Sequence, residues 1–77
     1  METVYIGIEQ DLPKALEYFE KAAEDGFKVA MYNAGKMYYR GTIGEKDMEK
    51  GIQYLRLAAY NNFERAIKFC KDNNVTL

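Results

Sequence analysis

Hydrophobic residues recur along this chain with the spacing of an α-helix in four separate stretches. In the first stretch they stand at positions 12, 15, 16, 19, 22 and 23, and a stretch from residue 48 to residue 59 repeats this spacing. Each is followed by another apolar stretch, and these begin at Phe27 and Phe63. Recurrence every three or four residues places the apolar side chains on one stripe of a helix. The pattern predicts four helices near residues 11–25, 28–40, 47–61 and 63–73.

Residues suited to helix ends stand at the borders of these stretches. Asp11 and Asp47 precede two of the helices, where a carboxylate can accept hydrogen bonds from the unpaired amides of the first turn. Gly26 and Asn62 follow the same two helices, and both residue types readily adopt the left-handed conformation that ends a helix. Because the connection at Gly26 is so short, we expect consecutive helices to form antiparallel hairpins.

The chain repeats itself at an offset of 36 residues. Residues 11–36 align without gaps on residues 47–72, and seven pairs are identical: Asp11/Asp47, Lys14/Lys50, Tyr18/Tyr54, Ala22/Ala58, Ala23/Ala59, Phe27/Phe63 and Ala30/Ala66. A fixed period of about 20–50 residues indicates a repeat architecture. We therefore predict an all-α superhelical solenoid of about two helix-turn-helix repeats, folded as a single domain over residues 1–77. Its parts would be a cap or the remnant of a preceding repeat (1–10), half a repeat (11–26), a full repeat (27–62), and a capping helix with its tail (63–77).

The composition excludes most types of catalytic site. The chain contains no His, no Ser and no Trp, and Cys70 is its single cysteine. Nucleophilic catalysis by Ser or Cys usually needs an imidazole base, and zinc sites draw on His or on clustered Cys. Carboxylates remain, so a pair of acidic side chains acting in acid-base catalysis stays open by composition. We predict that the protein is not an enzyme and needs no metal or cofactor.

One run of residues matches a known pattern closely. The run is Ala30, Ala34, Gly35, Tyr38 and Gly41, then Asp47, Lys50, Gly51, Tyr54, Ala58 and Ala59. It resembles the Sel1-like repeat family, a relative of the tetratricopeptide repeat, and residues 7–26 resemble the second half of another such repeat. The pattern departs at Ile43, which precedes the second loop glycine, and in the last helix, where Lys71 and Asn74 replace the Gly and the Tyr. The resemblance implies a non-catalytic adaptor or scaffold whose curved surface binds other proteins.

The resemblance also implies that helices 28–40 and 63–73 line the concave face of the stack. Several residues on these helices lie off the core stripe, and cations and tyrosines dominate among them: Val29, Tyr32, Lys36, Tyr39, Arg40, Arg65, Lys68 and Asp72. Our hypothesis is that this face binds an extended or helical peptide of acidic character, with tyrosines providing contact area and cations pairing with carboxylates. The alternative is an ordinary solvated face whose tyrosines pack on neighbouring side chains.

A second candidate interface lies on helix 47–61. Leu57 and Tyr60 stand where the first copy has Lys21 and Glu24, so this outer face is charged in one repeat and apolar in the other. The pair could form a dimer contact, a partner site or a surface covered by the last helix. Cys70, by contrast, falls on a core stripe, so we expect a buried and unreactive thiol.

The remaining expectations concern partners and location. With 11 basic and 12 acidic side chains the net charge is −1, which favours neither nucleic acid nor an anionic membrane. We expect a protein or peptide partner; the alternative function is a self-associating structural unit, a possible homo-oligomer, or a fragment of a longer repeat protein. No leader-like segment or long apolar stretch is apparent, so the default expectation is a cytoplasmic protein.

Overall fold

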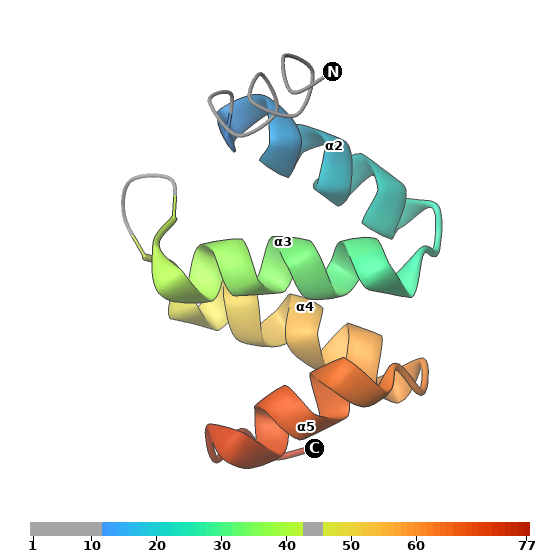
Figure 1. Ribbon diagram of the computed structural model, residues 1–77, viewed down its shortest axis with the longest axis vertical. Coiled ribbons are helices and arrows are strands. Elements are labelled where there is room, and N and C mark those ends of the chain that lie inside the picture. The colour runs from blue at the N-terminus through green and yellow to red at the C-terminus, as the bar shows by residue number, and fades with distance from the viewer. Residues whose placement is uncertain (1–11, 43–45) are drawn as a thin grey trace, which may run out of the picture.

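The computed structural model describes residues 12–42 and 46–77, which form four α-helices stacked one beneath another (Figure 1). The helices are α2 (Leu12–Glu24), α3 (Lys28–Arg40), α4 (Met48–Tyr60) and α5 (Glu64–Asp72). Each falls inside its predicted range, and the small differences arise because capping residues were counted as helix. The described residues contain no β-strand, so the predicted all-α repeat fold is confirmed. None of the described helices is long and apolar enough to cross a lipid bilayer.

The two short turns have the same construction. Gly26 and Asn62 adopt the left-handed conformation, with φ of 98° and 66°, as predicted. In each turn a phenylalanine amide donates to an alanine carbonyl at 3.1 Å, Phe27 to Ala22 and Phe63 to Ala58. Equivalent residues thus reverse the chain twice in the same way, and this places α2 against α3 and α4 against α5.

A side-chain cap begins α4. The Asp47 carboxylate accepts a hydrogen bond from the backbone amide of Lys50 at 3.1 Å, as predicted from its position before the helix. The equivalent residue, Asp11, lies outside the described residues.

Small residues let α3 and α4 cross closely. A Cβ atom at Gly51 would lie 2.7 Å from the Tyr39 backbone nitrogen and 2.8 Å from the Gly35 carbonyl oxygen. Leu55 fills the space beside this crossing and is fully buried. The rest of the buried core is also mainly small: Ala23, Ala30, Met31, Ala34, Ala58, Ala59, Ala66 and Cys70. Because no Cβ fits at the crossing, the glycines set the distance between the two helices.

The C-terminal tail turns back onto α4. The Val75 amide donates to the Cys70 carbonyl at 2.8 Å and ends α5. The Arg56 guanidinium then donates to the carbonyl of Thr76 at 2.8 Å, and the Tyr60 hydroxyl donates to the carbonyl of Leu77 at 3.2 Å. These bonds hold the tail against the last helical hairpin.

Candidate functional site

An aromatic cluster joins α3 to α5. Tyr32 makes edge-to-face contacts with Phe63 and Phe69, with ring centroids 5.3 Å and 6.4 Å apart, and Tyr39 contacts Phe69 in the same way at 5.3 Å. Beside this cluster is an open hollow of ≈ 310 Å³, lined by Tyr32, Arg65, Lys68, Phe69 and Asp72. We call this surface, together with Lys36 and Tyr39, the α3–α5 face.

Cations surround the aromatic part of the α3–α5 face. The Lys36 ammonium lies 4.5 Å from the centre of the Tyr32 ring, within the range of a cation–π interaction. Lys68 forms an exposed ion pair with Asp72, one turn along α5, at 3.5 Å. Within the described part of the chain, Arg65 has no acidic partner within 4.0 Å. The face can therefore offer positive charge to a ligand.

Six of the eight residues predicted for the concave face come together here, and two do not. Val29 and Arg40 line hollows between α2 and α3 instead. The reason is helical geometry: at about 100° per residue, these two positions are turned roughly 60–80° from Tyr32, towards α2. Lys36 is turned by only about 40°, and it lies at the border between the two surfaces.

Phe69 is a residue of this face that the sequence analysis missed. It follows Arg65 by four positions, so the two share one side of α5, and this spacing was the available signal. The apolar stripe predicted for this helix runs through Ala66, Ile67 and Cys70 and does not include Phe69. In the structure Phe69 is half-buried between the two tyrosines of α3.

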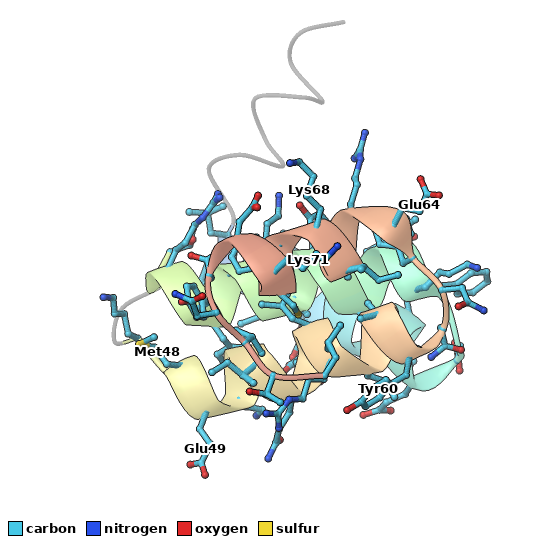
Figure 2. All side chains as sticks on the ribbon, turned by 90° about the horizontal axis from the view of Figure 1, so that it is seen from below. Met48, Glu49, Tyr60, Glu64, Lys68 and Lys71 are labelled. Atoms are coloured by element: carbon cyan, nitrogen blue, oxygen red, sulfur yellow. The ribbon has the colours of Figure 1, made fainter. Side chains whose placement is uncertain are left out.

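The second candidate interface is exposed. Leu57 and Tyr60 keep 43% and 61% of their surface accessible, so the interpretation that the last helix covers them is wrong. Figure 2 shows Tyr60 projecting from α4 on the side of the molecule away from Lys68. The only hydrogen bond recorded for the Tyr60 hydroxyl within the described residues is the one to the tail at Leu77. Leu57 and Tyr60 thus form a separate surface from the α3–α5 face.

A polar contact links α2, α3 and α4. The Tyr38 hydroxyl donates to the Glu20 carboxylate at 2.5 Å, and Lys50 lies 3.8 Å from the same carboxylate oxygen. The hydrogen bond to Glu20, with burial adding to it, raises the pKa of Tyr38 to about 12. The phenol therefore keeps its proton at neutral pH and acts as a structural donor.

Cys70 is fully buried, as predicted, and burial raises the pKa of its thiol, which disfavours the reactive thiolate. In residues 12–42 and 46–77, no three His, Cys, Asp or Glu side chains are grouped so that they could hold a metal ion. The features that stand out are hollows and exposed aromatic side chains, which are typical of interaction surfaces.

Stacked helical hairpins repeated every 36 residues define a helical-repeat protein. The family model of the Sel1 repeat matches residues 5–27 and 28–63, and the chain belongs to this family. The chain is also similar to the putative Sel1-like repeat-containing protein L18 of Acanthamoeba polyphaga mimivirus, with 39% identity over 46 residues. That match covers 60% of this chain and 8% of the viral protein, so the chain spans a small part of its relative. Among solved structures, none matches the chain significantly. Sel1 repeats are in general protein-interaction modules.

Proposed function

We propose that this chain is a protein-interaction module that binds a partner peptide or protein with acidic side chains on its α3–α5 face. The observation that carries the proposal is the hollow of ≈ 310 Å³, in which aromatic rings and the cations Arg65 and Lys68 converge. Interfaces concentrate binding energy in aromatic and arginine side chains that sit together in a pocket. Family membership supports the general function, and the geometry of the α3–α5 face supports this surface as the proposed site.

The aromatic part of the face is already ordered. Tyr32 and Phe69 are half-buried and hold each other through edge-to-face contacts. Immobilising a side chain on binding costs about 0.5–1.5 kcal/mol, and packing within the free protein reduces that cost. A partner would therefore bind to an apolar surface that is already ordered and is surrounded by cations.

The charges favour a carboxylate over a cation as ligand. Arg65 is exposed, and its guanidinium can donate two parallel hydrogen bonds to a carboxylate in a bidentate pair. In the Lys68 pair both side chains are more than half exposed, and such pairs contribute only about 0–1 kcal/mol. A carboxylate of the partner can therefore compete with Asp72 for Lys68.

Selection from a random peptide library displayed on phage tests this proposal. The full chain serves as bait, and we expect the enriched peptides to carry Asp or Glu beside an apolar residue. The Arg65→Glu variant should bind such a peptide about tenfold more weakly, since a charge-assisted hydrogen bond contributes about 1.5–3 kcal/mol. Lys21→Glu, which makes the same charge change on α2, is the matched control and should leave affinity within about twofold.

An equal loss of peptide affinity in Arg65→Glu and Lys21→Glu would show a general charge effect and refute the proposed site. Enrichment of peptides without acidic residues would refute the proposed ligand. The alternative of an obligate self-associating unit is tested separately by light scattering. The module proposed here should have the mass of one chain at micromolar concentration.

A further inference from the structure

A second hollow, next to the α3–α5 face, is lined by cations. It measures ≈ 240 Å³, and its lining residues are Phe19, Asn33, Lys36, Met37, Arg40 and Thr42. We call it the Arg40 hollow. Among the described residues, its lining includes two cations, Lys36 and Arg40, and no carboxylate. The charge of the hollow therefore favours an anionic group as its ligand.

The side chain of Arg40 is available to such a ligand. It is exposed, and within the described part of the chain no acidic group lies within 4.0 Å of it. A guanidinium can donate two parallel hydrogen bonds to one carboxylate, which a lysine cannot do. Lys36 stands one helical turn before Arg40 and lines the same hollow, so both cations can contact one anionic group.

The acidic residues of the neighbouring helix α2 do not neutralise these cations. The glutamates of α2, Glu17, Glu20 and Glu24, line a different hollow. Glu20 also accepts a hydrogen bond from Tyr38 and lies 3.8 Å from the ammonium of Lys50. The positive charge of the Arg40 hollow is thus left for a ligand.

Lys36 connects the Arg40 hollow to the α3–α5 face. Its ammonium lies 4.5 Å from the centre of the Tyr32 ring, and Tyr32 lines the hollow that contains Arg65. The same lysine lines the Arg40 hollow. One ligand can therefore extend from the first hollow to the second over Tyr32 and Lys36.

We propose that the Arg40 hollow binds a second acidic side chain of the same peptide that the α3–α5 face binds. One carboxylate would pair with Arg65 and the other with Arg40 and Lys36, and the peptide between them would cross Tyr32. This inference rests on the function proposed for the α3–α5 face. It adds that the peptide must be acidic at two places.

Helix geometry sets the spacing of the two acidic side chains. Tyr32 lines the first hollow and Arg40 the second, and eight residues of α3 at about 1.5 Å each separate them by about 12 Å. An extended peptide covers about 3.3 Å per residue, so about four residues span this distance. We therefore expect two acidic residues about four positions apart in the peptide.

Double-mutant cycles between protein and peptide test the second site. The probe is an acidic peptide selected on the full chain by phage display, from a library whose peptides are long enough to span both hollows. Titration calorimetry measures its Kd. Arg40→Gln should weaken binding about tenfold, the loss expected for a charge-assisted hydrogen bond.

Each acidic residue of the peptide is then replaced in turn by its amide. The replacement at one position should cause no further loss in Arg40→Gln, and the replacement at another position should cause no further loss in Arg65→Gln, because each pair of changes removes the same contact. These peptide variants leave the protein unchanged, so their losses do not depend on the folding of a protein variant. Lys21→Gln removes a positive charge from α2 outside both hollows and is the matched control. It should leave the Kd within about twofold, since an isolated exposed charge contributes little.

The possible failures are distinguishable. If Arg65→Gln weakens binding and Arg40→Gln does not, the second site is overturned and the function proposed for the α3–α5 face stands. The second site is also overturned if no acidic residue of the peptide couples to Arg40, if both arginines couple to the same residue, or if the selected peptides carry a single acidic residue. If neither arginine substitution changes the Kd, the proposed function fails and this inference fails with it.

Discussion

The crossing of α3 and α4 predicts that adding one methyl group will destabilise the fold, although the new residue is the better helix former. In Gly51→Ala, the added Cβ would meet the Tyr39 nitrogen at 2.7 Å, the Gly35 oxygen at 2.8 Å and the Tyr39 Cα at 3.0 Å. All three are backbone atoms of α3, so the clash can be relieved only by moving the helices apart.

The size of the effect follows from two opposing terms. Overpacking typically costs about 1–3 kcal/mol, and three backbone contacts place this substitution near the upper value. Alanine is favoured over glycine inside a helix by about 1 kcal/mol. The expected net loss is therefore about 2 kcal/mol in the free energy of unfolding. For a domain of this size, that loss corresponds to roughly 8–16 °C in Tm.

Urea unfolding followed by circular dichroism at 222 nm measures this loss. Ala15→Gly is the matched control, because it makes the reverse exchange at the equivalent position of α2, where the described helices include no partner at such a crossing. It should cost only the helix propensity, about 1 kcal/mol. If Gly51→Ala were as stable as the unchanged chain or more so, the close crossing would not exist as described.

Two further predictions concern the Asp47 cap and the half-buried phenol of Tyr38. Asp47→Ala removes the acceptor for the Lys50 amide and should lower the free energy of unfolding by about 1 kcal/mol, whereas Asp47→Asn, which keeps an acceptor, should cost much less. Because the folded state raises the pKa of Tyr38 to about 12, from an ordinary value of 10.0, its hydrogen bond to Glu20 stabilises the fold below pH 10. That contribution is lost as the pH rises from 10 towards 12. The urea midpoint of unfolding should therefore decrease between pH 9 and pH 11.5 by more in the unchanged chain than in Tyr38→Phe. Equal decreases in the two proteins would contradict this role of the hydrogen bond.

The helices and their ends were predictable because the signals are local. The apolar period, the Asp47 cap and the left-handed residues Gly26 and Asn62 act within a few residues of where they stand. The 36-residue repeat then predicted the stacking, since equivalent sequences form equivalent hairpins.

The surfaces were harder to predict because they depend on small rotations around each helix. Val29 and Arg40 are rotated by only about 60–80° around the α3 axis from Tyr32, and this rotation places them on the side of α3 that faces α2. The role of Phe69 depends on the position of α5 beside α3, where its ring contacts Tyr32 and Tyr39. The exposure of Tyr60 depends on where α5 lies relative to α4, which a repeat alignment does not specify.

The most direct test of the proposed function is to map where a selected acidic peptide binds. Such a peptide, enriched by phage selection, is added to the ¹⁵N-labelled full chain, and the backbone amide shifts are followed to saturation. We predict that the largest shifts fall on Tyr32, Arg65, Lys68 and Phe69, and that raising the salt concentration weakens binding. Shifts that leave these four residues unchanged and fall elsewhere on the chain would contradict a binding site on the α3–α5 face.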